Sequence, residues 1–275
     1  MNALLDVRDL RVTYGGGRRG RRRGAFRAVD GVSLSVAPEE TLGLVGESGS
    51  GKTTVARCVA GLISPGSGSL AFDGQPLGPV GRRPAALQRA VQMVFQDPRS
   101  SLNPRMTVAA VIGEAWRTHP SAAPDGDRTE ALHRLLDDVG LDSSTASRRA
   151  GDLSGGQCQR VSIARALAVS PRLLVCDEAV SALDVSVQAQ ILRLLDDLRR
   201  EHRLALLFIS HDLGVVHQIA DRVAVMRRGE VVEEGLAADV LGAPRHEYTR
   251  ALLDAALDLD DGASERTGAT GEMPA

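Results

Sequence analysis

Short apolar runs alternate along the chain with segments whose apolar residues recur at helical spacing. Apolar, β-branched runs of roughly four to eight residues predict buried strands, and recurrence at every third or fourth position predicts helices with one apolar face. The predicted strands are 4–12, 32–36, 41–45, 69–73, 91–95, 173–177, 204–210, 222–226 and 230–234. The predicted helices are 55–62, 108–116, 129–139, 157–168, 186–201 and 213–219. Strands that alternate with helices indicate an α/β fold with a mainly parallel sheet.

The alternation is interrupted between Asp97 and Asp152. Helical patterns replace the strand patterns there, and joints rich in Pro and Ser separate them. We therefore expect residues 97–152 to form a helical subdomain, inserted into one domain that spans residues 1–257. Residues 258–275 are rich in Gly, Asp, Glu, Ser and Thr and have little apolar surface to bury, so we expect a disordered tail.

Composition narrows the class of protein. The 275 residues are 43% hydrophobic, and 33 basic against 35 acidic residues leave a net charge of −2, which speaks against a nucleic-acid partner bound through bulk charge. Cys58, Cys158 and Cys176 are widely spaced, which disfavours a disulfide framework or a cysteine zinc site. No apolar run is long enough to span a bilayer, and the first residues lack a signal-peptide pattern. Any membrane role is expected to act through a partner.

The predicted strand 41–45 runs directly into Gly46-Glu47-Ser48-Gly49-Ser50-Gly51-Lys52-Thr53-Thr54, which fits the phosphate-loop pattern. Such a loop and the following helix N-terminus point successive backbone N–H groups at one anion. Lys52 can reach the β- and γ-phosphates of a nucleotide, and the Thr53 hydroxyl can ligate Mg²⁺. Lys52 is also the only lysine of the chain, which marks position 52 as a place where a guanidinium does not replace the ammonium.

The predicted strand 173–177 ends in two adjacent carboxylates, Asp177 and Glu178. Open α/β sheets bind their ligands at the carboxyl ends of the strands. Asp177 suits the ligand shell of Mg²⁺, and Glu178 suits orienting and polarising an attacking water. Many buried strands end in an acid, so this pair gains its meaning together with the phosphate loop.

The segment Leu153-Ser154-Gly155-Gly156-Gln157 opens the predicted helix 157–168. Ser154 is a good N-cap, and the paired glycines expose backbone N–H groups to an anion. A phosphate loop, then LSGGQ, then an apolar strand ending in Asp-Glu, in this order, resembles the ATP-binding subunit of an ABC transporter. The resemblance runs from about Leu4 to Leu252. It implies a P-loop NTPase (RecA-like) core with an antiparallel β subdomain and an inserted α-helical subdomain.

The resemblance implies roles for single residues. Tyr14 would stack on adenine. The residues implied to be catalytic are Glu178, the switch histidine His211, the Q-loop glutamine Gln96, and Lys52. The residues implied to bind ATP are Tyr14, Gly46, Glu47, Ser48, Gly49, Ser50, Gly51, Lys52, Thr53 and Thr54. The residues implied to bind Mg²⁺ are Thr53, Gln96 and Asp177.

The resemblance also implies partners. In this family two such domains pair head to tail, so that ATP binding closes the dimer and hydrolysis opens it. The residues implied to contact the ATP of the opposite chain are Ser154, Gly155, Gly156, Gln157 and the D-loop residue Asp184. The partners would be a second ATP-binding subunit, identical or different, and two transmembrane permease subunits, at the cytoplasmic face of the membrane. A monomer is expected to hydrolyse ATP poorly.

Three longer stretches resemble the ATPases of oligopeptide, dipeptide and nickel importers. They are 95–107, 180–190 and 246–252, the last within a peptide-importer-type segment at about 236–257. Such importers also use an extracytoplasmic solute-binding protein. The chain departs from the family in three places: Ala179 stands where Pro is usual, Cys158 where Arg is common, and Glu247 where the tail motif has Pro.

Alternatives stay open at this point. An exporter subunit differs in its membrane partner, which the sequence does not show. A soluble ABC ATPase of translation or DNA repair usually has two such domains or a long coiled-coil insertion, and this chain shows neither. A subunit that binds ATP without hydrolysing it is disfavoured by Glu178 and His211. The basic run 18–23 fits contact with lipid or nucleic acid, or a solvated loop tip, and the Arg-rich composition favours the loop tip.

Overall fold

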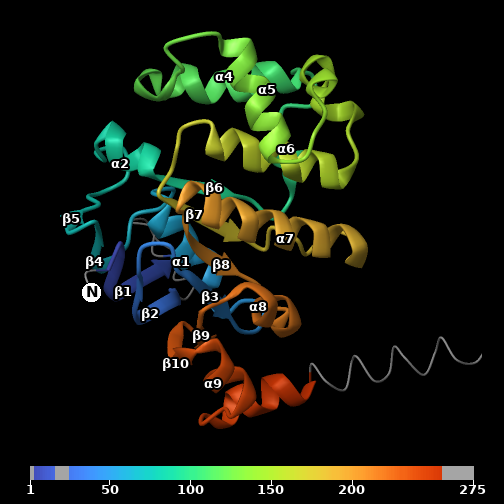
Figure 1. Ribbon diagram of the computed structural model, residues 1–275. Coiled ribbons are helices and arrows are strands. Elements are labelled where there is room, and N and C mark those ends of the chain that lie inside the picture. The colour runs from blue at the N-terminus through green and yellow to red at the C-terminus, as the bar shows by residue number, and fades with distance from the viewer. Residues whose placement is uncertain (1–2, 16–24, 256–275) are drawn as a thin grey trace, which may run out of the picture.

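The computed structural model describes residues 3–15 and 25–255. The basic run 18–23, the predicted boundary at residue 257 and the predicted tail 258–275 therefore lie outside the described residues. Two sheets and the helices around them make up the described chain (Figure 1).

The central sheet has six strands in the order β10-β9-β3-β8-β7-β6. Their bounds are β3 (Thr41–Val45), β6 (Val91–Val94), β7 (Leu173–Asp177), β8 (Ala205–Ile209), β9 (Arg222–Arg227) and β10 (Glu230–Leu236). Neighbouring strands are parallel except β9 and β10, which are antiparallel. The predicted α/β fold with a mainly parallel sheet is confirmed.

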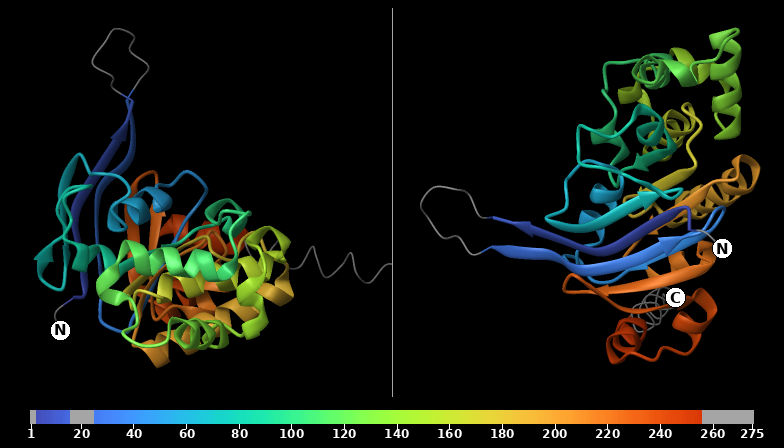
Figure 2. Two further views of the ribbon diagram at one scale, coloured as in Figure 1. Left: turned by 90° about the horizontal axis from the view of Figure 1, so that it is seen from above. Right: turned by 90° about the vertical axis from the view of Figure 1, so that its left-hand side faces the viewer.

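The second sheet is antiparallel, with the order β2-β1-β4-β5. Its strands are β1 (Leu5–Tyr14), β2 (Phe26–Val36), β4 (Ser67–Phe72) and β5 (Gln75–Pro76). Strands β1 and β2 form a long ribbon that extends away from the molecule (Figure 2).

The prediction that the second strand begins at Val32 is wrong, because β2 begins at Phe26. The added residues mix charged and apolar side chains: Val29 pairs with Val12 of β1, whereas Arg27 and Asp30 interrupt the apolar pattern. Arg11 lies 2.6 Å from Asp30 across the two strands, and Arg27 lies 2.7 Å from the same carboxylate. Apolar periodicity therefore does not detect this half of the strand.

One group of helices flanks the central sheet, and a second group follows β6 and precedes β7 in the chain. The flanking helices are α1 (Lys52–Val59), α2 (Ala85–Ala90), α7 (Val185–His202), α8 (Leu213–Ile219) and α9 (Ala237–Gly242), and residues 247–255 are also helical. Between β6 and β7 lie α3 (Pro98–Ser101), α4 (Val108–Thr118), α5 (Arg128–Asp138) and α6 (Gly155–Leu167). Helices α2 and α9 have six residues each, too few to show a helical period in the sequence.

The stretch from 97 to 152, predicted to be a helical subdomain, holds α3, α4, α5 and the short 3-10 helices Pro120–Ala122, Ser143–Ser147 and Ala150–Asp152. Helix α4 is tied to the end of α6 by the single tryptophan of the chain. The indole Nε1 of Trp116 donates a hydrogen bond of 2.9 Å to the carbonyl of Ala168. This contact fixes the position of α4 relative to the helix that carries the LSGGQ segment.

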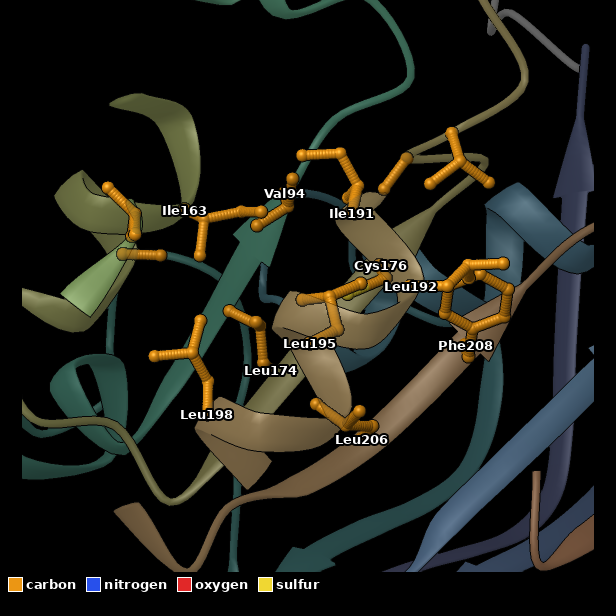
Figure 3. Packing of buried hydrophobic residues seen from close by; sticks show 14 of the residues in the cluster. Val94, Ile163, Leu174, Cys176, Ile191, Leu192, Leu195, Leu198, Leu206 and Phe208 are labelled. Atoms are coloured by element: carbon orange, nitrogen blue, oxygen red, sulfur yellow. The ribbon is translucent and has the colours of Figure 1, made fainter. Parts of the chain in front are cut away.

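Alternate residues of a central strand face opposite apolar cores. On β7, Leu173 and Val175 pack in the core that includes α1, whereas Leu174 and Cys176 pack in the core that includes α6 and α7. Figure 3 shows the second core, where strand residues meet the α7 residues Ile191, Leu192, Leu195 and Leu198. A strand buried on both faces reads as a continuous apolar run, which is why the sequence predicts these strands well.

All three cysteines are buried, and they are unpaired, which agrees with the prediction of free thiols. Burial raises the pKa of Cys58 to about 11 and that of Cys176 to about 12. Both groups are therefore thiols rather than thiolates at neutral pH, and they behave as small apolar side chains.

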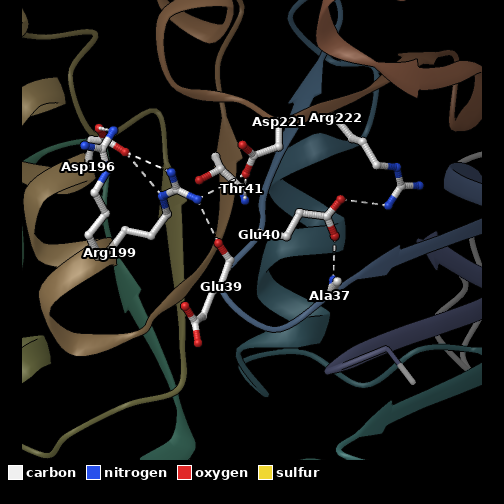
Figure 4. Close-up of polar contacts among 9 residues, drawn as sticks. Ala37, Glu39, Glu40, Thr41, Asp196, Arg199, Asp221 and Arg222 are labelled. Carbon is white, nitrogen blue, oxygen red and sulfur yellow. Dashed lines mark hydrogen bonds and ion pairs between the residues drawn. The ribbon is translucent and has the colours of Figure 1, made fainter. Parts of the chain in front are cut away.

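A polar network fixes the start of β3, the strand that leads into the phosphate loop (Figure 4). The backbone N–H of Thr41 donates to the Asp221 carboxylate at 2.8 Å, and Arg199 lies 3.2 Å from the same carboxylate. Next to it, Arg222 lies 3.0 Å from Glu40. These contacts join α7 and the start of β9 to Glu40 and Thr41, where β3 begins.

Gly43 of β3 tests how tightly this strand is packed. A Cβ at this position would lie 2.5 Å from Cγ1 of Val216 and 3.1 Å from Cβ of Ala220. We expect Gly43→Ala to lower the free energy of unfolding by about 1–3 kcal/mol, because overpacking shifts α8 or β3. Chemical denaturation of the nucleotide-free protein measures this change.

The matched control for this variant is Gly113→Ala in α4, where an added Cβ meets no atom within 4 Å. Alanine favours a helix over glycine, so this variant should gain roughly 0.5–1 kcal/mol. Equal stability of Gly43→Ala and the wild type would show that the space between β3 and α8 accommodates an added methyl group.

Candidate active site

The phosphate loop occupies the turn between β3 and α1, as the sequence predicts. Its first and last glycines are required by close packing. Gly46 has φ +144° and a Cβ there would lie 2.1 Å from the carbonyl oxygen of Met226, and Gly51 has φ +109° with the carbonyl oxygen of Ala28 at 2.3 Å. Strands β9 and β2 thus hold both ends of the loop, and only glycine fits at either end.

The Lys52 ammonium lies inside the loop, and the residue is only 4% exposed. Its Nζ donates to the carbonyl oxygens of Gly46 at 2.7 Å and Glu47 at 2.9 Å, and lies 3.5 Å from Oγ of Ser50. Burial lowers the pKa of Lys52, and the nearby carboxylates of Glu178 and Asp177 oppose this shift. A localised positive charge is therefore held at the centre of the loop.

Thr53 and Asp177 bring two oxygen ligands together. Thr53 Oγ1 donates a hydrogen bond of 2.9 Å to Oδ1 of Asp177, the last residue of β7. Asp177 is 5% exposed, and burial raises the pKa of its carboxyl group. A hydroxyl and a buried carboxylate are the hard oxygen donors that Mg²⁺ prefers, so these residues fit a magnesium ion.

Two side chains, which follow the strands on either side of β7, converge on the carboxylate of Glu178. Gln96, shortly after β6, donates through Nε2 to Oε2 of Glu178 at 2.7 Å. Nδ1 of His211, shortly after β8, lies 3.4 Å from the other oxygen, Oε1. Glu178 follows β7, which lies between β6 and β8 in the sheet. The predicted Q-loop glutamine, glutamate and switch histidine are therefore in contact.

The turn after Glu178 is well held although Ala179 replaces the usual proline. Glu178 adopts a positive φ of 48°, and its N–H donates to the carbonyl of Ile209 at 3.0 Å. Its own carbonyl accepts from the N–H of Ser181 at 3.2 Å and from the Ser181 hydroxyl at 3.0 Å. Ala179 itself is buried, with 1% exposed. These hydrogen bonds close the turn without the restriction that a proline ring would add.

A cavity of about 300 Å³ joins these groups. It is lined by Tyr14, Phe26, Ala28, Ser48, Gly49, Gly51, Lys52, Thr53, Thr54, Gln96 and Glu178. Tyr14 ends β1, is 42% exposed, and has its hydroxyl 3.4 Å from Oγ1 of Thr54. The structure thus places the predicted adenine residue at the same cavity as the phosphate loop.

Phe26 is a residue of this cavity that the sequence analysis missed. It pairs with Tyr14 across strands β1 and β2 and is 61% exposed. The sequence offers no local signal for this position, because the pairing that places Phe26 beside Tyr14 crosses the unpredicted half of β2. The cavity therefore presents two aromatic side chains.

The LSGGQ segment forms the start of α6. Ser154 is the N-cap: its Oγ accepts from the N–H of Gln157 at 3.2 Å, and Oε1 of Gln157 accepts from the N–H of Ser154 at 3.1 Å. This reciprocal capping box starts the helix at Gly155 rather than at the predicted residue 157. A Cβ at Gly156 would lie 2.7 Å from Cγ1 of Val187, so glycine lets α6 approach α7 closely.

Asp184 caps the neighbouring helix α7. Its Oδ1 accepts from the N–H of Val187 at 3.0 Å. Within the part of the chain that the structure describes, neither Asp184 nor any residue of 154–157 lines the phosphate-loop cavity. The structure therefore brings together residues predicted to bind ATP and Mg²⁺, whereas those predicted to act across a dimer do not line this cavity.

The fold and the site together define a P-loop NTPase with helices inserted between β6 and β7. Comparisons with known proteins narrow this class: the sequence profile of the ABC transporter family matches residues 29–181. The oligopeptide transport ATP-binding protein OppF of Escherichia coli K12 is 48% identical over 233 residues, which cover 84% of this chain and 69% of OppF. OppF of Bacillus subtilis is 45% identical over 246 residues, which cover 89% of this chain and 80% of that protein.

Among solved structures, the dimeric ATP-binding cassette MJ0796, in a post-hydrolysis state bound to ADP and Pi, is similar with a TM-score of 0.72. It is 27% identical and the match covers 85% of this chain and 98% of that one. The chain belongs to the ABC transporter family, as an ATP-binding subunit with ATPase activity. Among the helices of the described chain, none has the length and apolar character needed to cross a membrane.

The buried carboxylate of Asp177 is expected to destabilise the nucleotide-free protein at neutral pH. Because its pKa is raised, the folded protein is favoured while this carboxyl group is protonated at low pH. That contribution to stability is lost as the pH rises through the folded-state pKa of the group. Asp177→Asn keeps an oxygen that can accept from Thr53 and removes the charge. We expect this variant to raise the unfolding temperature by roughly 2–4 °C at pH 7 while ATP turnover falls. The gain should shrink as the pH is lowered.

Asp142→Asn is the control for this prediction. The Asp142 side chain caps the turn at Ser144, and hydrogen bonds from Ser144 lower the pKa of its carboxyl group, so loss of this charge should give no thermal gain. Thermal unfolding between pH 4 and pH 8 compares both variants with the wild type. A fall in unfolding temperature for Asp177→Asn at pH 7 would contradict the argument from burial.

Proposed function

We propose that this chain binds and hydrolyses ATP to power an ABC importer of oligopeptides or dipeptides, with nickel as the other solute that the sequence resemblance allows. The observation that carries the proposal is that Lys52, Thr53, Gln96 and Glu178 line one cavity. Asp177 is hydrogen-bonded to Thr53, and His211 lies beside Glu178. Similarity to oligopeptide transport ATP-binding proteins over most of the chain supports the class of solute.

In this proposal the nucleotide lies along the cavity from Tyr14 to Glu178. The adenine stacks on Tyr14, and the backbone N–H groups of the phosphate loop bind the phosphates at the N-terminus of α1. The Lys52 ammonium, which contacts loop carbonyls, supplies positive charge to the β- and γ-phosphates.

Thr53, Asp177 and Gln96 are the residues that would hold Mg²⁺. When bound, Mg²⁺ neutralises charge on the phosphates and orients them. The raised pKa of Asp177 supports this role, because a carboxylate that is buried without a cation is destabilised, and a nearby cation favours its charged form.

Glu178 orients and polarises the water that attacks the γ-phosphate. Its two carboxylate oxygens face different neighbours, Gln96 at 2.7 Å and His211 at 3.4 Å. Gln96 keeps the carboxylate in place through a hydrogen bond, and in this proposal His211 contacts the γ-phosphate. As the water attacks, the bond between the γ-phosphorus and the ADP oxygen breaks, and ADP and phosphate are the products.

The proposed working unit is a head-to-tail pair with a second ATP-binding subunit, joined to two permease subunits at the cytoplasmic face of the membrane and served by an extracytoplasmic solute-binding protein. The LSGGQ residues 154–157 and Asp184 would complete the nucleotide site of the opposite chain. None of these residues lines the described cavity of its own chain, which supports this assignment.

Glu178→Gln tests the role of this carboxylate. The variant keeps an oxygen that can accept from Gln96, so ATP binding should be preserved, while steady-state hydrolysis should fall by about 100-fold or more because the charge that polarises water is lost. Incubation with Mg²⁺ and ATP should therefore accumulate a dimer, measured by size-exclusion chromatography with light scattering. Glu201→Gln, at an exposed position of α7, is the control. Normal turnover in Glu178→Gln would remove Glu178 from the central role.

Solute uptake tests the importer itself. A strain that lacks this chain should take up labelled tri- to pentapeptides poorly, wild-type chain should restore uptake, and Glu178→Gln should not. The tagged chain should also co-purify from membranes with two permease subunits. Restored uptake of nickel without peptide would replace the peptide class by the metal. Unchanged uptake of both, with loss of solute efflux, would identify an exporter subunit.

A further inference from the structure

The C-terminal segment 246–252, which the sequence analysis singled out, contacts the phosphate loop. Tyr248 lies in the helical residues 247–255 and is only 6% exposed. Its hydroxyl oxygen accepts a hydrogen bond of 3.1 Å from the backbone N–H of Glu47, which lies 201 residues away in the chain. The second residue of the phosphate loop is therefore held by a side chain from the end of the described chain.

This hydrogen bond and the one from the Lys52 ammonium are made by the same peptide group. The N–H of Glu47 and the carbonyl of Gly46 are the two polar ends of one peptide group. The carbonyl accepts from Nζ of Lys52 at 2.7 Å, while the N–H donates to Tyr248. Hydrogen bonds at opposite ends of a peptide group polarise one another, so the tyrosine strengthens the carbonyl as an acceptor for the ammonium.

We propose that Tyr248 is a positioning residue for nucleotide binding, which holds the Gly46–Glu47 peptide group and through it sets the position of the Lys52 ammonium. The C-terminal segment then contributes to ATP affinity without touching the nucleotide. This role is separate from the transported solute and depends only on ATP binding by the phosphate loop.

The tyrosine is itself fixed from several directions. The guanidinium of Arg227, the last residue of β9, lies 4.7 Å from the centre of its ring. The N–H of Tyr248 donates to Nδ1 of His246 at 3.0 Å. The carboxylate of Glu233 on β10 accepts from the N–H groups of Arg245 at 2.7 Å and His246 at 3.1 Å. The central sheet therefore supplies a rigid base for the hydroxyl.

The chemistry of the phenol suits this position. Burial raises the pKa of Tyr248, so the hydroxyl stays neutral and accepts the Glu47 N–H without a buried negative charge beside the phosphates. A phenylalanine would fill the same space and keep the contact with Arg227. Only the hydroxyl reaches the loop, so Tyr248→Phe separates positioning from packing.

Tyr248→Phe in the full-length chain should bind ATP about three- to tenfold more weakly than the wild type, the range expected for loss of one hydrogen bond that supports a charged group. Binding is measured with ATP titrated against a fluorescent ATP analogue. The KM for ATP should rise by a similar factor while kcat at saturating ATP changes little. Arg250→Gln, exposed on the same helix, is the control and should bind ATP like the wild type.

A double-mutant cycle with Lys52→Ala shows whether the tyrosine acts through the lysine. In the Lys52→Ala background, Tyr248→Phe should change ATP affinity by less than about twofold, because the ammonium that it positions is absent. Equal losses in both backgrounds would overturn the proposal and leave Tyr248 a general support of the loop. Unchanged ATP affinity of Tyr248→Phe in the wild-type background would overturn it directly.

Thermal unfolding without nucleotide checks that Tyr248→Phe is folded. If it is not folded, the double-mutant cycle is repeated with Arg227→Gln in place of Tyr248→Phe. This variant keeps the hydroxyl group of Tyr248 but removes the cation that holds the ring in position. Its expected loss of ATP affinity is smaller and should again vanish with Lys52→Ala. An Arg227→Gln protein that binds ATP like the wild type would then overturn the proposal.

Discussion

A buried ammonium has to be surrounded by acceptors, and this requirement at Lys52 organises the site. The carbonyls of Gly46 and Glu47 supply two acceptors, and the negative charges of Asp177 and Glu178 oppose the loss of charge that burial favours. The loop can bend its carbonyls inward only because glycine at position 46 fits against β9. Strand packing, loop shape and charge are thus parts of one arrangement.

The order of the sheet explains why distant residues meet at this charge. Strands β3, β8, β7 and β6 are consecutive neighbours and parallel, so their carboxyl ends lie along one edge. The phosphate loop, His211, the Asp177–Glu178 pair and Gln96 follow these four ends in turn. No side chain has to reach far, which is why Glu178 can contact both its neighbours at hydrogen-bond or near hydrogen-bond distance.

The sequence predicts this part of the site because each motif follows a strand buried on both faces, whose apolar run is easily detected. It predicts less where charged residues interrupt a strand or where a contact is long-range. The N-terminal half of β2 mixes Arg27 and Asp30 with apolar residues, so neither the strand start nor the place of Phe26 was predicted. The contact of Tyr248 with the loop joins residues 201 positions apart, and no local pattern encodes that distance.

The segment after Glu178 gives the proposed dimer a physical route to its own nucleotide site. Hydrogen bonds from Ser181 hold the carbonyl of Glu178, and the next turn ends at Asp184, the cap of α7. Val187 of α7 lies against the position where Gly156 of α6 has no side chain, so the two helix starts that would meet the partner are packed together. In the proposed pair, a partner that presses on these caps would act on a short, hydrogen-bonded segment whose other end is the carboxylate proposed to orient water. Closure of the pair and placement of that carboxylate are then linked through few residues, which accounts for the expectation that a single chain hydrolyses ATP poorly.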